Sequence, residues 1–92
     1  MARLSEKAIG TSLRSVKGWK RVGDEIAKTF VFKDFARSMG FVQSVALIAE
    51  KMNHHPDIDI RWNKVMLTLS THSAGGLTTK DFALAAEINA LS

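Results

Sequence analysis

Two stretches of strand-like alternation, separated by one long helical stretch, restrict the fold of this chain more than any other feature. In the first stretch, residues 18–22 and 27–32 favour strands, and a Gly-Asp-Glu turn signal separates them. In the second, apolar and polar side chains alternate over residues 58–62 and 65–72, and residues 63–64 have the length of a two-residue hairpin turn. The sequence therefore predicts two β-hairpins.

The long helical stretch covers about residues 33–52. Its apolar residues recur every three or four positions in two adjoining stripes, which together give a wide apolar face. The first stripe contains Phe35, Met39, Val42, Ala46 and Ala49, and the second contains Phe41, Val45, Ile48 and Met52. Pro56 disfavours the α conformation at His55, so the helix should end by about Asn53. The face is wide enough to serve both the core and an interface.

Shorter helices are predicted near both ends of the chain. Ser5 is a suitable N-cap for a helix that runs to about Leu13. Residues 78–81, Thr-Thr-Lys-Asp, have the form of a capping box that begins a last helix. The element order is then α-β-β-α-β-β-α, which predicts an α+β fold: a four-stranded antiparallel sheet with three helices packed on one face. A chain of 92 residues has room for one core, so we expect a single domain over residues 1–92.

Composition argues against several classes of protein. The chain has no cysteine, which excludes disulfides and thiolate metal sites, and it has no run of about 20 apolar residues that would span a membrane. The N-terminus lacks the apolar core of a signal peptide, so we expect a cytoplasmic protein. The net charge is +4, but the basic residues are scattered singly without a nucleic-acid motif. Nucleic-acid binding is therefore the weakest of the hypotheses.

All three histidines lie between positions 54 and 72, and this clustering is the main functional signal. His54 and His55 are adjacent and follow the predicted end of the long helix. His72 is expected at the end of a strand, on the face that carries Thr68 and Ser70. A helix end and a strand end can approach each other in this fold. These imidazoles can then act on one bound molecule as general acids and bases.

Other chemistries have less support. Adjacent histidines in a loop rarely bind one metal ion together, and the His-Glu-x-x-His spacing of helical zinc sites is absent, so no metal site is predicted. The Gly-x-Ser-x-Gly elbow of serine hydrolases is also absent. Taken singly, Glu50 is a typical solvated charge and Asp81 a typical capping-box residue. Trp62 is more often a core residue than the wall of a ligand site.

Seven residues at fixed spacings nevertheless form one pattern, Glu50-x3-His54-His55-Pro56-x5-Trp62-x9-His72-x8-Asp81. This pattern resembles the signature of the pterin-4a-carbinolamine dehydratase family, also called dimerization cofactor. Residues 32–35, 50–56, 63–65 and 67–72 look like family sequence as well, and the similarity runs from about residue 16 to the C-terminus.

The resemblance implies the α+β fold described above and a hydro-lyase activity. The reaction is dehydration of 4a-hydroxytetrahydropterin to the quinonoid dihydropterin, which recycles the tetrahydropterin cofactor of aromatic amino-acid hydroxylases. The resemblance also implies a pterin substrate, no metal or organic cofactor, a homodimer or homotetramer, a hydroxylase as pathway partner and no membrane. Animal members also act as transcriptional coactivators that stabilise dimers of a partner. A non-catalytic binding module of the same fold is therefore the alternative function.

The resemblance also assigns the site. His54, His55 and His72 correspond to the three active-site histidines of the family. The residues expected to bind the substrate are Asn53, His54, His55, Ser70, Thr71, His72 and Ser73, and the residues expected to support the site are Glu50, Pro56, Trp62 and Asp81.

The chemistry suits these residues. Loss of water from C4a needs an acid for the leaving hydroxyl and a base for a ring N–H proton. We expect His54 and His72 to be the proton-transfer pair and His55 to orient the substrate, with Glu50 or Asp81 fixing a tautomer.

The chain departs from the family pattern at four positions. Asn53 stands where an aspartate is common, Ile58 where an aromatic is common and Trp62 where tyrosine is more usual. Ser73 stands where the family often has an acidic residue. Because no histidine is lost, these departures bear on substrate affinity and on the preferred pterin side chain more than on the type of reaction.

Overall fold

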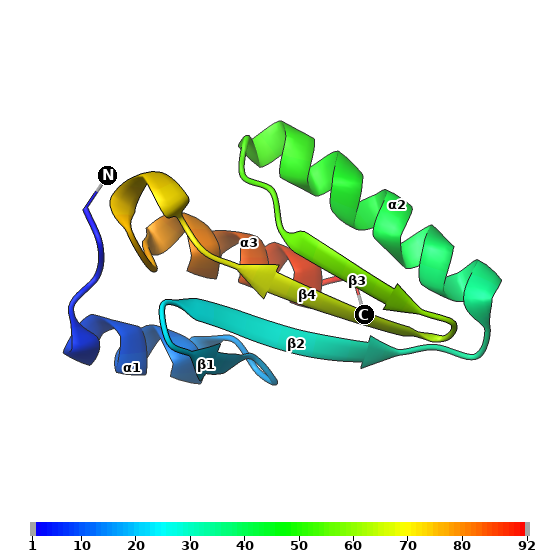
Figure 1. Cartoon of the computed structure of the whole chain (residues 1–92), viewed down its shortest axis with the longest axis horizontal. Helices are drawn as coiled ribbons and strands as arrows, with labels where there is room; N and C mark the ends of the chain where they lie inside the picture. The colour runs from blue at the N-terminus through cyan, green and yellow to red at the C-terminus, as the bar shows by residue number, and fades with distance from the viewer. Residues whose placement is uncertain (1, 92) are drawn as a thin grey trace.

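Four antiparallel strands form one sheet in the order β1-β2-β4-β3, and three α-helices cover one of its faces (Figure 1). The structure is a computed structural model that describes residues 2–91, so Met1 and Ser92 of the expected domain lie outside the described residues. Its elements are α1 (Glu6–Ser15), β1 (Lys20–Val22), β2 (Glu25–Val31), α2 (Phe35–Met52), β3 (Asp57–Arg61), β4 (Lys64–Leu69), the 3-10 turn η1 (His72–Ala74) and α3 (Thr79–Asn89). The predicted element order and α+β class are confirmed.

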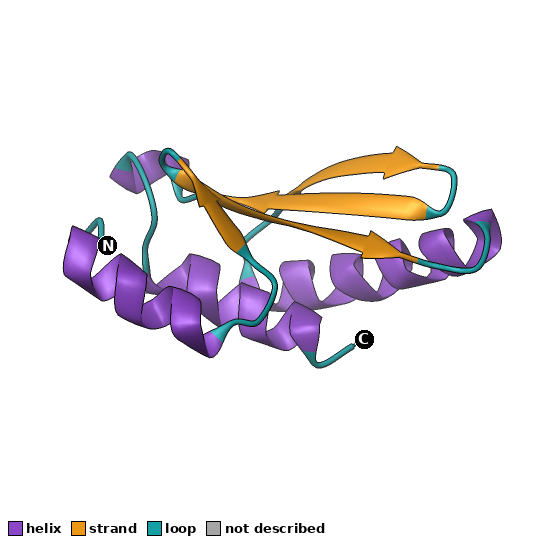
Figure 2. Cartoon of the chain, turned by 90° about the horizontal axis from the view of Figure 1, so that it is seen from below, coloured by secondary structure: helices purple, strands orange, loops and turns teal. Residues whose placement is uncertain are grey.

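The two hairpins are joined through the central strands β2 and β4, in which Lys28 lies opposite Leu67. Alternate side chains of a strand point to opposite faces of the sheet, so each strand has one face toward the helices. The core side chains from these two strands are at most 5 % exposed: Ile26, Phe30, Val65, Leu67 and Leu69. Figure 2 shows the three α-helices as one layer and the sheet as another, with the far face of the sheet uncovered.

Both ends of α2 are set by local signals in the sequence. Asp34 is the N-cap, and its carboxylate accepts a hydrogen bond from the backbone N–H of Arg37 at 2.8 Å. Asn53 ends the helix in the left-handed conformation, with φ 52°. The predicted end of the helix is therefore confirmed.

The wide apolar face of α2 is divided between core and surface. Phe41 and Val45 of the second stripe are buried, whereas Phe35 and Met39 of the first are 52 % and 41 % exposed.

Within residues 2–91, no helix is both long enough and apolar enough to cross a bilayer.

The β3–β4 turn lies one residue earlier than predicted. Arg61 pairs with Lys64, so Trp62 and Asn63 form the two-residue turn. The Asn63 side-chain amide donates to the carbonyl of Phe32 at 3.0 Å, and the Asn63 carbonyl accepts from the Phe32 N–H at 2.8 Å, which fixes the turn against the chain after β2. Trp62 takes a positive φ of 51° and is 66 % exposed, so the expectation of a core residue is wrong.

Strand β4 ends at Leu69, three residues before its predicted end. The N–H of Thr71 donates to the carbonyl of Gly76 at 3.0 Å, and the N–H of Gly76 donates back at 3.3 Å. This isolated bridge closes a short loop that contains η1. His72 therefore projects from a loop, and not from a strand face that it would share with Thr68 and Ser70.

The left-handed turn residue provides a test of the fold. Trp62→Gly should be more stable than Trp62→Ala by about 1 kcal/mol, because the left-handed conformation costs a residue with a Cβ about 1–2 kcal/mol. Urea unfolding followed by circular dichroism measures the difference. At Thr68, in the extended strand β4, the order should be reversed and glycine should be the less stable variant. A glycine variant at 62 that is no more stable than the alanine variant would contradict the turn geometry.

Candidate active site

His54 is the buried member of the histidine cluster. The left-handed residue Asn53 ends α2, and the backbone N–H of His54 donates to the carbonyl of Ala49 at 3.1 Å. This bond fixes the position of the imidazole at the helix end, where the residue is 9 % exposed. Its Nε2 lies 2.6 Å from Oδ1 of Asp81, in the first turn of α3. The end of one helix is thus joined to the start of another.

Asp81 is fully buried, and both of its carboxylate oxygens are hydrogen-bonded. Besides the contact with His54, its Oδ2 accepts from the backbone N–H of Thr78 at 2.9 Å and from the hydroxyl of Thr71 at 2.8 Å. The bond to Thr78 completes the predicted capping box of α3. The unpaired N–H groups and the helix dipole at this end stabilise a negative charge.

His55 is paired in a different environment. Its Nε2 contacts Oε2 of Glu50, which lies on the last turns of α2. The two side chains are 56 % and 76 % exposed. Water screens such a pair, so it contributes little to stability. The contact can still orient the imidazole of His55.

His72 opens η1 and is exposed. Its ring makes no hydrogen bond to another side chain or backbone group within residues 2–91. Two residues earlier, the hydroxyl of Ser70 donates to the carbonyl of Asp24 at 3.0 Å, which ties the loop to the β1–β2 turn. Hydrogen bonds of the loop backbone therefore set the position of His72, and none of these bonds fixes the orientation of its ring.

One hollow of about 300 Å³ brings the three histidines together. Its lining residues are Asn53, His54, His55, Ser70, Thr71, His72, Ser73 and Lys80. All seven residues predicted to contact the substrate thus line the same hollow. Lys80 is not among the predicted residues. Lys80 directly precedes Asp81 in the first turn of α3, but no pattern in the sequence indicates that it lines the hollow.

The supporting residues divide into three groups. Glu50 and Asp81 reach the hollow through the histidines that they contact. Pro56 is partly buried in the link between α2 and β3. Trp62 lies on the β3–β4 turn, at the end of β4 away from η1, so the structure does not bring it to the hollow (Figure 1).

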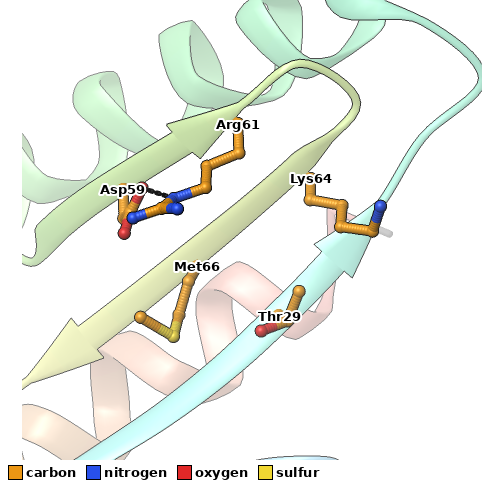
Figure 3. A pocket seen from close by; sticks show the side chains of 5 residues that line it. All are labelled: Thr29, Asp59, Arg61, Lys64 and Met66. Atoms are coloured by element: carbon orange, nitrogen blue, oxygen red, sulfur yellow. Dashed lines mark hydrogen bonds and ion pairs between the residues drawn. The ribbon is translucent and has the colours of Figure 1, made fainter.

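Another hollow lies on the uncovered face of the sheet (Figure 3). It is lined by Thr29, Asp59, Arg61, Lys64 and Met66. The guanidinium of Arg61 lies 3.2 Å from Asp59, and both side chains are exposed, so this ion pair is weak. The hollow contains no histidine. Within residues 2–91, no three or more His, Cys, Asp or Glu side chains are grouped so that they could hold a metal ion. The histidine-lined hollow is the better candidate for an active site.

Comparison with known proteins agrees with the resemblance seen in the sequence. The profile of the family described as pterin 4 alpha carbinolamine dehydratase matches residues 2–91. The chain belongs to the pterin-4a-carbinolamine dehydratase family. A protein of Thermomicrobium roseum, provisionally named a dehydratase of this family, is 49 % identical over 92 residues, which cover 100 % of this chain and 99 % of the relative. A Roseiflexus protein with the same provisional name is 54 % identical over 87 residues, 95 % of this chain and 94 % of the relative.

Two solved structures are similar to this dehydratase-family chain. The first, described as a transcriptional coactivator/pterin dehydratase from Brucella melitensis, has a TM-score of 0.93 and 41 % identity, and the match covers 97 % of each chain. The second is described as a pterin dehydratase-like RuBisCO assembly factor of the alpha-carboxysome. It has a TM-score of 0.69 and 27 % identity, over 80 % of this chain and 88 % of the other. Membership of the family supports a pterin carbinolamine dehydratase activity in general.

The two histidine–carboxylate pairs should differ in their effect on stability. Asp81→Ala should lower the free energy of unfolding by about 3 kcal/mol, because it leaves buried donors of His54, Thr71 and Thr78 without an acceptor. Glu50→Ala should cause little change, because its pair is exposed. Urea unfolding followed by circular dichroism measures both. Equal losses in the two variants would contradict the buried position of Asp81.

Proposed function

We propose that this protein converts 4a-hydroxytetrahydropterin to the quinonoid dihydropterin by general acid–base catalysis. The observation that carries the proposal is the single hollow in which three histidines from two distant segments line one space. In the reaction the C4a–O bond breaks, the leaving hydroxyl takes a proton and departs as water, and a ring N–H gives up a proton. Two positioned imidazoles can supply both transfers.

The environments of the histidines support separate roles. His54 and His72 are the proposed proton-transfer pair: the imidazole of His54 is held by a buried carboxylate, and that of His72 makes no hydrogen bond to residues 2–91. His55, oriented by Glu50, is proposed to position the pterin ring. Lys80 lines the same hollow and offers a further hydrogen-bond donor to the substrate.

The reaction moves only protons and water, so the proposal invokes no metal and no organic cofactor. The quinonoid dihydropterin would return to the tetrahydropterin pool of an aromatic amino-acid hydroxylase, the proposed pathway partner, only after a separate reductase had added two electrons and two protons. The family profile and the provisional names of the relatives support the substrate class.

The dehydration assay tests the proposal directly. A hydroxylase generates 4a-hydroxytetrahydropterin, and its decay is followed spectroscopically with and without this protein. Wild type should accelerate the decay, and His54→Ala and His72→Ala should each lower kcat by about 10²-fold or more, since a positioned acid or base contributes 10²–10⁴. Substrate should still bind to both variants, because other residues of the hollow remain.

A matched control is Lys51→Ala, which removes an exposed basic side chain on the last turn of α2. It should keep the wild-type rate. Near-wild-type turnover in both histidine variants would show that the proton-transfer pair is assigned wrongly, and a wild-type protein without any acceleration would refute the activity.

A second candidate function, a binding module, is favoured by the exposed part of α2. Phe35, Met39 and Leu47 are 52 %, 41 % and 67 % exposed on this helix. Large apolar side chains exposed on one helix are typical of surfaces that meet another protein. The Brucella structure is described as a coactivator, and the carboxysome structure as an assembly factor. We propose that copies of this chain meet through α2 as a dimer or tetramer, and that the same face can receive another partner.

Light scattering tests the proposed interface. Met39→Glu and Leu47→Glu should each lower the molar mass of the assembly, because a charge would have to be buried at the contact. Ala83→Glu, an exposed position on α3, is the control and should leave the mass unchanged. A monomeric wild type, or an assembly that both variants leave intact, would contradict an interface on α2.

A further inference from the structure

Thr71 lies in the wall of the histidine-lined hollow, but its hydroxyl points into the protein. The residue is 6 % exposed. Its Oγ1 lies 2.8 Å from Oδ2 of Asp81 and 2.8 Å from Oγ1 of Thr78. A side chain engaged in this way has no hydroxyl to offer a substrate. Its function must lie in what it does to its neighbours.

The directions of these hydrogen bonds follow from counting protons. A carboxylate is only an acceptor, so the single hydroxyl proton of Thr71 goes to Asp81. The hydroxyl of Thr78 must then donate to Thr71, and it accepts in turn from the backbone N–H of Lys80 at 3.2 Å. The result is a chain of donors that starts at the first turn of α3 and ends on Oδ2 of Asp81. Each bond in such a chain polarises the next.

This series of hydrogen bonds determines how His54 is held. Oδ2 of Asp81 already accepts two hydrogen bonds, from Thr71 and from the N–H of Thr78, so Oδ1 is the oxygen that meets the imidazole. The contact lies at Nε2, which must carry a proton because the carboxylate can only accept. Nδ1 is then the ring nitrogen left for a molecule in the hollow.

Thr71 also positions the second histidine. Its backbone N–H and carbonyl form the bridge with Gly76 that closes the η1 loop, and its carbonyl accepts from the N–H of Ala74 at 3.0 Å. His72 is the next residue along the chain. One residue therefore contacts the carboxylate that holds His54 and anchors the loop that carries His72.

We propose that Thr71 is a positioning residue for proton transfer in this site. Acting through Asp81, it holds His54 in the tautomer whose Nδ1 faces the substrate, and its backbone bridge sets where His72 stands relative to that nitrogen. The inference rests on the dehydratase function proposed above, and it concerns a hydroxyl that does not touch the substrate.

Three substitutions test it. Thr71→Ser keeps the hydroxyl and should keep kcat, whereas Thr71→Val, which is nearly isosteric, and Thr71→Ala should each lower kcat about tenfold or more with little change in KM, as expected when an acid–base group loses its alignment. Thr68→Val, on the neighbouring strand β4, is the control and should match wild type. Circular dichroism confirms that each variant is folded at the assay temperature.

The tautomer of His54 gives a readout that does not depend on activity. Nitrogen-15 NMR of histidine-labelled protein should show the Nε2–H form of His54 in wild type and in Thr71→Ser, and a mixture of tautomers in Thr71→Val and Thr71→Ala. Unchanged kcat and an unchanged tautomer in the valine and alanine variants would overturn the proposal, as would a serine variant as impaired as valine. A wild type without dehydratase activity would refute the proposed function, while the NMR result would still decide whether Thr71 holds the tautomer.

Discussion

The hydrogen bonds of the buried carboxylate of Asp81 connect the fold to the site. One oxygen completes the capping box that begins α3, and the other meets the imidazole at the end of α2. A charge without water is tolerated only if it is fully hydrogen-bonded. Here the positive end of a helix, a backbone N–H, a hydroxyl and an imidazole all contribute. The start of one helix, the end of another and the loop after β4 are therefore held in one arrangement.

The contrast between the two histidine–carboxylate pairs follows from their depth. His54 and Asp81 are 10 % and 0 % exposed by side chain, so their contact lies in a medium of low dielectric and keeps one geometry. His55 and Glu50 stand in water, where the pair forms and breaks at little cost. The fixed geometry of His54 suits the proton transfer proposed for it, and the adjustable pair of His55 suits the proposed orientation of a ligand. The different environments of adjacent residues thus suit different tasks at one site.

Periodicity and capping predict most of the fold, because both act over a few residues. The alternation in β2 and β4 gives the core face, and the Asn53 and Thr78 signals give the helix boundaries. The predictions are wrong where contacts between residues far apart in the sequence determine the local structure. Trp62 is in the turn because Asn63 bonds to Phe32, which lies 31 positions away in the chain.

In the site, too, local patterns predict some features and long-range contacts determine the others. Spacing and resemblance predict the residues that line the hollow and the two supporting carboxylates, but not which carboxylate contacts which histidine. The end of β4 depends on the bridge between Thr71 and Gly76, which takes His72 off the strand. Lys80 enters the hollow only because α3 begins beside the end of α2, and no local pattern contains that approach.

The positions of the hollow and of the exposed apolar side chains bear on how one fold can serve different functions. The histidine-lined hollow lies at the C-terminal end of α2, whereas Phe35 and Met39 lie on its first turns and Leu47 lies between these two regions. A helix of 18 residues is about 27 Å long at 1.5 Å per residue, so the two regions share a scaffold but few contacts. Substitutions at Phe35 or Met39 would therefore test the proposed interface at a distance from Asp81. Solved structures described as a transcriptional coactivator/pterin dehydratase and as a pterin dehydratase-like assembly factor indicate that this one fold serves more than one function.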